Sequence, residues 1–112
     1  MINLCVDEAY AFDYLSILQI KSGRSEQAKQ AWQNCYNYLK AQLPNDLFIQ
    51  IINSQEYENV LSVNKKTFDA VELARYGNIS AKEVDSANME RHYAKIALQK
   101  RFFLTNLTEQ KT

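Results

Sequence analysis

The stretch DSANMERHYAKIALQKRFF, residues 85–103, decides the fold, because it reads as most of one long C-terminal helix. Ser80 and Glu83 lie just before it and match the S-x-x-E capping box, in which each side chain satisfies a free amide of the first helical turn. The sequence therefore predicts a helix that begins at Ser80 and can extend past Phe103.

Two stripes of side chains run along this predicted helix. The apolar stripe is assigned to the core and consists of Met89, Tyr93, Ile96 and Phe103. The polar stripe, with members three or four residues apart, consists of Asn88, Arg91, Lys95 and Gln99. Val84, Leu98 and Phe102 interrupt the polar stripe. Because a solvated face seldom carries such residues among its charges, we expect this side to contact something.

The sequence allows several partners for the polar stripe. One is another part of the same fold, for example the acidic first helix with Glu8 and Asp13, and another is a second copy of the chain. A third is a phosphate-bearing ligand, since Arg91 and Lys95 supply charged donors and the two amides can orient polar groups. Contacts within the fold or within a dimer are preferred, and the four residues are kept as candidate ligand or partner contacts.

The N-terminal part of the chain predicts two helices joined by a short turn. Residues 7–21 carry apolar side chains on nearly every face, which predicts a helix that is buried on several sides. Gly23 is available for a left-handed cap, and Ser25 is the next N-cap. Residues 26–43 have the three-and-four spacing of an amphipathic helix. Together these segments predict an αα-hairpin.

The middle of the chain is less regular. Pro44 stops the second helix, and LFIQII, residues 47–52, fits either a buried strand or a short buried helix. A helix is chosen because a single strand would have no partner elsewhere. Ser54 is predicted to cap a short helix that ends near Leu61, and Asn64 to cap a further helix that runs to Tyr76, with Gly77 as its stop.

These segments predict an all-α, single-domain irregular helical bundle of four to six helices spanning residues 1–112. It has an N-terminal αα-hairpin and a long C-terminal helix, and residues 105–112 are expected to fray. The predicted core contains Phe12, Leu15, Trp32, Phe68, Val71, Met89, Tyr93 and Ile96.

Composition narrows the classes of function. Lys plus Arg equals Asp plus Glu, 13 against 13, which gives no overall field to attract nucleic acid or an anionic membrane. Cys5 and Cys35 form no CxxC pair or zinc spacing, and two reduced thiols suit the cytoplasm. No stretch reaches the roughly 18 apolar residues that would span a bilayer, so no membrane partner is expected. No cofactor motif is present either.

A metal-dependent all-α nucleotide hydrolase is the main enzymatic alternative. Such an enzyme needs several carboxylates around one metal, whereas Asp7, Glu8 and Asp13 point to different sides of their helix. Asp69 and Glu72, three residues apart, could supply an adjacent pair. His92 has no nearby carboxylate to orient it and is read as a boundary residue of its helix.

A nucleic-acid-binding protein is the third alternative. VELARYGNISAKEV, residues 71–84, has the rhythm of a helix-turn-helix motif. The second helix is too long for that motif, however, and its first turns carry acidic rather than basic residues.

Taken together, CVDEAYAFDYLSIL (residues 5–18) and VDSANMERHYAKIALQKRFF (residues 84–103) resemble small uncharacterised proteins of tailed phages and marine environmental sequence. The resemblance implies a small helical accessory protein without an assigned activity, in the host cytoplasm if phage-encoded. Seven tyrosines, five phenylalanines and one tryptophan are more than one small core readily hides. The leading expectation is therefore a non-enzymatic interaction protein that associates with itself.

Overall fold

The computed structural model describes residues 5–77 and 80–103, and the regular structure in these ranges is entirely helical. The five helices are α1 (Glu8–Lys21), α2 (Glu26–Gln42), α3 (Leu47–Ile52), α4 (Gln55–Arg75) and α5 (Ala81–Phe102). The all-α prediction of four to six helices is confirmed, as is the helical assignment of residues 47–52.

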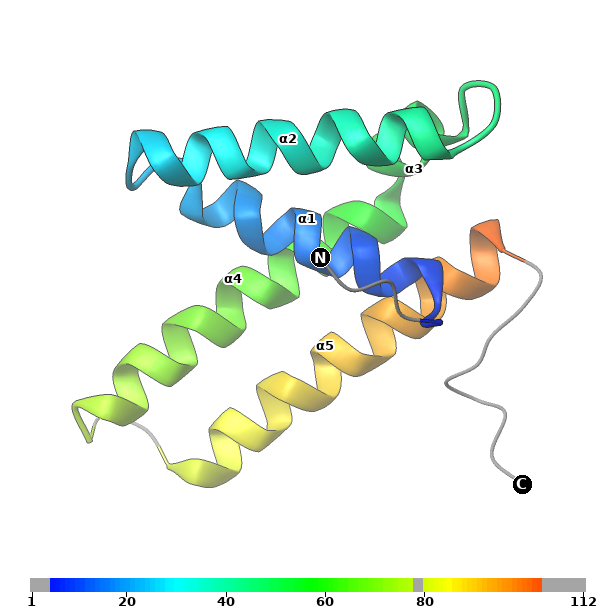
Figure 1. Cartoon of the computed structure of the whole chain (residues 1–112). Helices are drawn as coiled ribbons and strands as arrows, with labels where there is room; N and C mark the ends of the chain where they lie inside the picture. The colour runs from blue at the N-terminus through cyan, green and yellow to red at the C-terminus, as the bar shows by residue number, and fades with distance from the viewer. Residues whose placement is uncertain (1–4, 78–79, 104–112) are drawn as a thin grey trace.

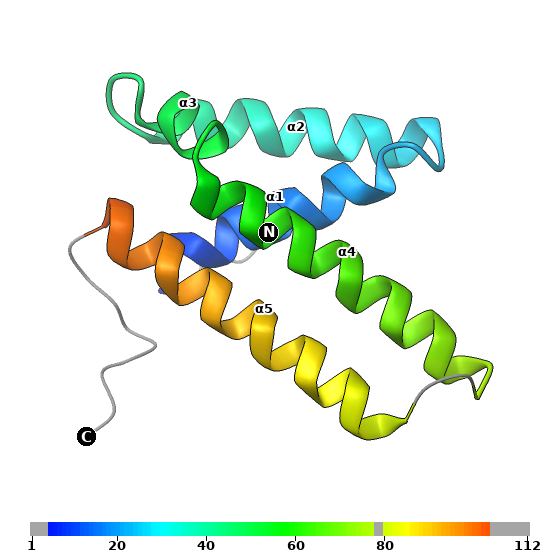
Figure 2. The same ribbon diagram turned by 180° about the vertical axis from the view of Figure 1, so that it is seen from behind.

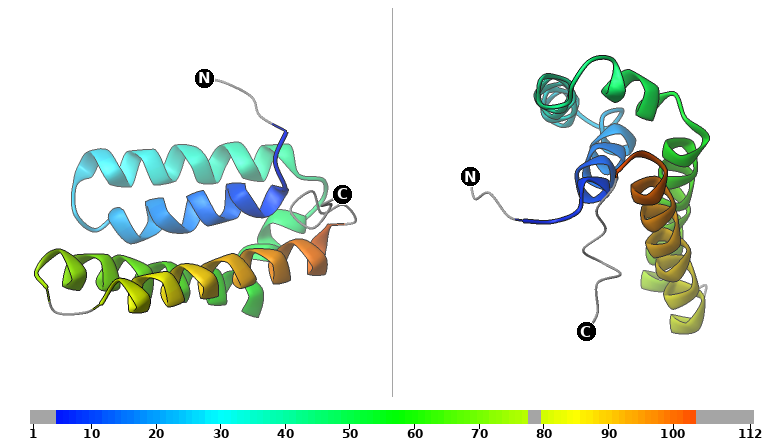
Figure 3. Two further views of the ribbon diagram at one scale, coloured as in Figure 1. Left: turned by 90° about the horizontal axis from the view of Figure 1, so that it is seen from below. Right: turned by 90° about the vertical axis from the view of Figure 1, so that its right-hand side faces the viewer.

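Two antiparallel pairs of helices build the molecule. α4 and α5 form the longer pair, whose connected tip extends away from α1 and α2 (Figures 1 and 2). α1 and α2 form the predicted N-terminal αα-hairpin. α1 lies between α2 on one side and the α4–α5 pair on the other (Figure 3, left). This central position gives α1 contacts with α2, α4 and α5, and its Phe12 also meets α3 in the core.

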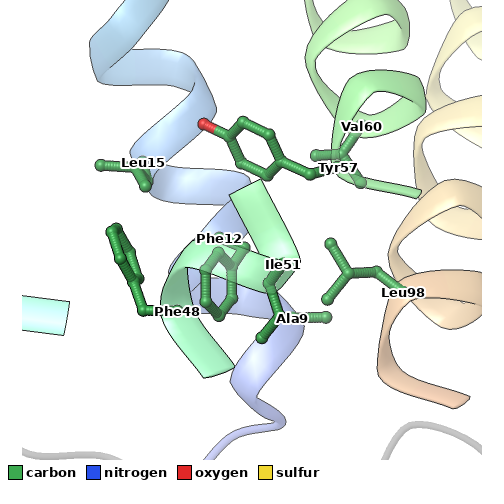
Figure 4. Close-up of a cluster of buried hydrophobic side chains, with 8 residues drawn as sticks. All are labelled: Ala9, Phe12, Leu15, Phe48, Ile51, Tyr57, Val60 and Leu98. Atoms are coloured by element: carbon green, nitrogen blue, oxygen red, sulfur yellow. The ribbon is translucent and has the colours of Figure 1, made fainter. Parts of the chain in front are cut away.

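The hydrophobic core lies where α1, α3, α4 and the end of α5 meet (Figure 4). The ring of Phe12 lies 5.9 Å from that of Phe48 and 6.3 Å from that of Tyr57, measured between ring centroids. The buried apolar residues of this cluster are Ala9, Phe12, Leu15, Phe48, Ile51, Tyr57, Val60 and Leu98. α3 is short but contributes two of these residues, Phe48 and Ile51.

The predicted break before Asn64 is wrong, since α4 runs without interruption from Gln55 to Arg75. An asparagine caps a helix when its side chain bonds to the nearby backbone. Here the side chain of Asn64 instead bonds to α1, and the residue is 2% exposed in the middle of α4. The cap of Ser54 is confirmed, because its hydroxyl accepts a hydrogen bond from the amide of Tyr57 at 3.1 Å.

Of the two predictions about glycines, the one for Gly77 is confirmed and the one for Gly23 is wrong. Gly77 takes a positive φ of 75° two residues after α4 ends at Arg75, as expected for a glycine that stops a helix. Gly23 takes no left-handed conformation. α1 ends at Lys21, and the backbone of the next residue, Ser22, stays right-handed, with its amide donating to the carbonyl of Gln19.

Only part of the predicted apolar stripe reaches the core: Phe103 packs against it and Ile96 is half-buried, but the prediction is wrong for Met89 and Tyr93. Met89 is 51% exposed and Tyr93 is 59% exposed, whereas Ala87, Leu98 and Gln99 are buried. The physical reason is that α5 places its small residues against α4 and turns its polar stripe toward α1. α5 also ends at Phe102 and does not extend past Phe103.

The remaining core predictions have mixed outcomes. Phe12 and Leu15 are buried, Trp32, Phe68 and Ile96 are half-buried, and Val71 is exposed. The expected fraying of residues 105–112 lies outside the described residues. None of the described helices combines the length and the apolar character that crossing a bilayer requires.

Candidate functional site

An ion pair joins α1 to α5 at the centre of the molecule. The Nε of Arg91 donates to Oδ1 of Asp13 at 3.2 Å, and its Nη2 donates to Oδ2 at 2.8 Å. The carboxylate of Asp13 is largely buried, and the hydrogen bond that it accepts raises the pKa of Arg91 above its usual value. The pair is therefore a bidentate, charge-assisted contact rather than a surface ion pair.

Asn64 of α4 extends this pair into a network across three helices. Its Nδ2 donates to Oδ1 of Asp13 at 2.8 Å and to the hydroxyl of Ser16 at 2.6 Å. Ser16 in turn donates to the backbone carbonyl of Asp13. The amide orientation of Asn64 follows from these partners, because a flipped amide would place its carbonyl oxygen against a carboxylate. Oδ1 of Asn64 is buried and accepts no hydrogen bond.

Gln99 joins α5 to the first turn of α1. Its Oε1 accepts a hydrogen bond from the backbone amide of Ala9 at 2.8 Å, and its Nε2 donates to Oε1 of Glu8 at 2.8 Å. Asp7 occupies the N-cap position of α1 but makes no side-chain cap to the helix backbone. Gln99 therefore satisfies a helix-terminal amide from a distant part of the chain.

The other two members of the polar stripe lie at its edges. Nζ of Lys95 lies 4.4 Å from the centroid of the Tyr10 ring on α1, a cation–π contact. Asn88 is exposed and lines a cavity beside Arg91. The structure thus pairs Arg91, Lys95 and Gln99 with α1, which are contacts within the fold, and leaves Asn88 at the surface.

The cavity next to Arg91 has a volume of about 190 Å³ and lies between α1, α4 and α5. Its apolar wall includes Ile17, Phe68 and Val71. Its polar wall includes Asn64 and Arg91, so the cavity directly adjoins the network around Asp13.

A second hollow lies on the outer face of the N-terminal hairpin, and we call it the tyrosine groove. It has a volume of about 420 Å³ and is lined by Ala11, Tyr14, Asn34, Cys35, Tyr38 and Leu39. Tyr14 is 56% exposed and Tyr38 is 55% exposed. No residue of this lining carries a charge, and burial raises the pKa of the Cys35 thiol.

The structure does not bring the acidic candidates together. Asp69 and Glu72 are both exposed, and only Asp69 lines the shallow groove that also holds Glu83 and Glu90. Within residues 5–77 and 80–103, no group of three or more metal-binding side chains could hold an ion. His92 is half-buried beside Tyr93, as expected for a boundary residue.

Two features of these sites were missed from the sequence. Asn64 occupies a stripe of α4 with Tyr57, Val60 and Thr67, three or four residues apart. A polar residue in such a stripe signals a buried hydrogen-bond network as well as it signals a cap. The tyrosine groove also left a signal, because a helix that is apolar on nearly every face, such as residues 7–21, leaves one face uncovered in a small protein.

Compared with protein-family models, curated protein sequences and solved structures, the chain matches none of them.

Proposed function

We propose that the chain is a non-enzymatic interaction protein that binds a second copy of itself through the tyrosine groove. The observation that carries the proposal is the pair of half-exposed tyrosines, Tyr14 and Tyr38, on either side of a groove without charged residues. Tyrosine is enriched and charge is depleted at the centres of protein interfaces. Large exposed apolar patches also mark interaction sites in soluble proteins.

A second copy is the partner that this chemistry suits best. A twofold interface places the same patch of each subunit against the other, so any charge on the patch meets its own copy. An uncharged groove avoids this repulsion. The half-exposed rings of Tyr14 and Tyr38 can enter the groove of the opposite subunit, where the apolar side of Leu39 receives them.

An interface of ordinary size has to extend beyond the groove. A stable interface buries about 800 Å² on each partner, roughly a tenth of the total surface of 7806 Å². Tyr10, which is 40% exposed, precedes Tyr14 by four residues on α1, and Val6, which is 51% exposed, lies just before the helix begins. The face can therefore extend along α1 beyond the groove itself.

The competing functions gain no specific support. A metal-dependent hydrolase requires converging carboxylates, and Asp69 and Glu72 do not share one groove. A helix-turn-helix protein presents a short recognition helix, whereas α4 and α5 are 21 and 22 residues long. For the compartment, the free thiols of Cys5 and Cys35 support the cytoplasm.

Sedimentation equilibrium over a range of protein concentrations tests the proposal. We expect wild type to populate a dimer, and Tyr14→Arg or Tyr38→Arg to shift the protein to monomer, because each places like charges across the twofold axis. Tyr93→Arg is the matched control, since Tyr93 is 59% exposed on α5, away from the groove. Circular dichroism verifies that all variants fold.

A monomeric wild type at high concentration contradicts self-association. A dimer that Tyr93→Arg disrupts and Tyr38→Arg does not would place the interface on another face.

A further inference from the structure

A hollow lined by aromatic residues lies between the N-terminal hairpin and the first turns of α4. Its volume is about 200 Å³. Three of its lining residues are aromatic, namely Trp32, Tyr36 and Tyr57, and one is charged, Glu58. Pockets for drug-sized ligands have volumes of about 300–1,000 Å³. This hollow is therefore suited to a small head group rather than to an extended molecule.

Trp32 and Tyr36 of α2 form two walls of the hollow that meet at an angle. Their ring centroids lie 5.7 Å apart, and the ring planes are inclined by 60°. Both side chains are half-buried, and both line the hollow. A cation is attracted to the face of an aromatic ring within about 6 Å of its centroid. Because the two rings are inclined rather than stacked, one cation in the angle between them can lie within this distance of both.

Tyr57 of α4 supplies a third wall whose position is fixed. Its hydroxyl donates to Oε1 of Gln19 on α1 at 3.0 Å, and Figure 4 shows the ring reaching from α4 toward α1. The other side of the ring meets Phe12 edge to face, and Tyr57 is only 4% exposed. A side chain held in this way loses little conformational freedom when a ligand binds, so the hollow is preorganised.

The charge of the lining favours a cation. Glu58 is exposed, makes no ion pair with any residue that the structure describes, and is the one charged residue among those described that line the hollow. Burial, with smaller contributions from Cys35 and Glu58, raises the pKa of the Tyr57 hydroxyl, so the charge of Glu58 reaches this wall. Within residues 5–77 and 80–103, no cation–π contact involves Trp32, Tyr36 or Tyr57. These rings are therefore not already occupied by a cation of the fold.

We propose that this hollow binds the trimethylammonium group of a small free cation such as choline, with Trp32 and Tyr36 against its methyl groups and Glu58 opposite its charge. Aromatic residues around a quaternary ammonium are a known mode of recognition. A quaternary ammonium has no N–H group that requires an acceptor, which suits a lining of rings. The proposal is independent of self-association, because the tyrosine groove shares no lining residue with this hollow.

The fluorescence of Trp32 reports on the hollow directly, because it is the only tryptophan of the chain. Choline chloride is titrated in exchange for sodium chloride, so that the ionic strength stays constant. The matched probe is neohexanol, in which a carbon atom replaces the nitrogen of choline and the shape is retained without the charge. We expect a saturable change with choline and at least tenfold weaker binding of neohexanol, since only choline makes cation–π contacts.

Two substitutions separate the contributions of charge and rings. Glu58→Gln should weaken choline binding about fivefold, the effect of one exposed opposite charge. Glu72→Gln is its matched control, because Glu72 is exposed on the same helix and lies outside the lining. Tyr36→Leu should weaken binding about tenfold by removing one ring, and Tyr93→Leu, at an exposed position on α5, should leave it unchanged. Circular dichroism verifies folding, and the exposed Glu58 keeps the test decisive if Tyr36→Leu does not fold.

Three results would overturn the proposal: a fluorescence change that does not saturate with choline, equal affinity for choline and neohexanol, or equal effects of Glu58→Gln and Glu72→Gln. Two larger sources of the same group complete the test. Phosphocholine should bind more weakly than choline, because Glu58 repels its phosphate, and trimethyl-lysine with blocked termini should bind no more tightly than choline. Tighter binding of either would contradict a free small cation and assign the hollow to a lipid head group or to a modified protein.

Discussion

Replacing Arg91 with alanine removes the charged partner of Asp13 and should destabilise the protein strongly. The Asp13 side chain is 8% exposed and the Arg91 side chain is 29% exposed. In the variant, Asp13 loses both hydrogen bonds from the guanidinium and keeps the one from Nδ2 of Asn64. A carboxylate that was compensated in the folded protein becomes a largely buried charge without a cation.

The size of the destabilisation by Arg91→Ala follows from how deeply Asp13 and Arg91 are buried. Removing one partner of a fully buried ion pair costs about 3–5 kcal/mol. The remaining hydrogen bond from Asn64 and the partial exposure of Arg91 both reduce this cost, so we expect about 3 kcal/mol. Domains of this size are stable by only about 5–15 kcal/mol. The variant should fold, but with a clearly lower unfolding midpoint.

Urea unfolding followed by circular dichroism measures this difference in the free energy of unfolding. Lys66→Ala is the matched control, because the Lys66–Glu90 pair is exposed, at 62% and 44% for the two side chains. An exposed pair contributes at most about 1 kcal/mol. If Arg91→Ala costs about 0.5 kcal/mol or less, like a surface substitution, the reasoning about the buried network is refuted.

Three further predictions test other parts of the structure. Phe12→Ala should cost about 3–5 kcal/mol in urea unfolding, whereas Met89→Ala should stay within about 0.5 kcal/mol, because Phe12 is buried and Met89 is 51% exposed; equal costs would show that α5 presents a different face to the core. In a thiol-labelling time course near pH 8, Cys5 should react quickly and Cys35 slowly, because Cys5 is exposed and burial raises the pKa of the Cys35 thiol. The protection of Cys35 should increase with protein concentration, and equal rates for the two thiols would contradict the described burial. Burial also raises the pKa of the Tyr57 hydroxyl above its ordinary value of 10.0, so the unfolded chain releases this proton first and stability falls as the pH rises above about 10. Tyr57→Phe should lower the free energy of unfolding by about 1 kcal/mol at neutral pH, because it removes the hydrogen bond to Gln19. The free energy of unfolding of the variant should also fall less steeply at alkaline pH than that of wild type. Parallel pH profiles of the two proteins would show that Tyr57 does not cause the alkaline loss of stability.

Local signals in the sequence were sufficient to predict most of the helices. The S-x-x-E box places Ser80 at the N-cap of α5, where its hydroxyl accepts a hydrogen bond from the amide of Glu83. Gly77 ends α4 with a positive φ. These signals depend on neighbours a few residues away, so a single sequence contains them.

Which face of each helix lies inward could not be predicted in the same way. Met89 and Tyr93 are apolar or aromatic and yet exposed, because α5 turns the side that carries Arg91 and Gln99 toward α1, where these two residues donate hydrogen bonds to Asp13 and Glu8. These pairs are separated by 78 and 91 positions in the sequence. The sequence allows the acidic first helix as one of several partners of the polar stripe, and only the packing of α1 against α5 selects it.

The role of Asn64 also depends on contacts between helices that are distant in the sequence. Its residue type favours a helix cap, whereas its place in the stripe of Tyr57, Val60 and Thr67 fits a buried position equally well. The decision depends on Asp13 and Ser16, which accept its hydrogen bonds from another helix. The buried position of Asn64 follows from these contacts between helices.

The most direct test of the central claim is an isotope-filtered NOE measurement on a mixture of labelled and unlabelled chains, which detects only contacts between two copies. Self-association through the tyrosine groove predicts contacts from the rings of Tyr14 and Tyr38 in one copy to Leu39 and Ala11 in the other. Contacts confined to the α4–α5 tip, or none at concentrations well above those used for sedimentation, would contradict it.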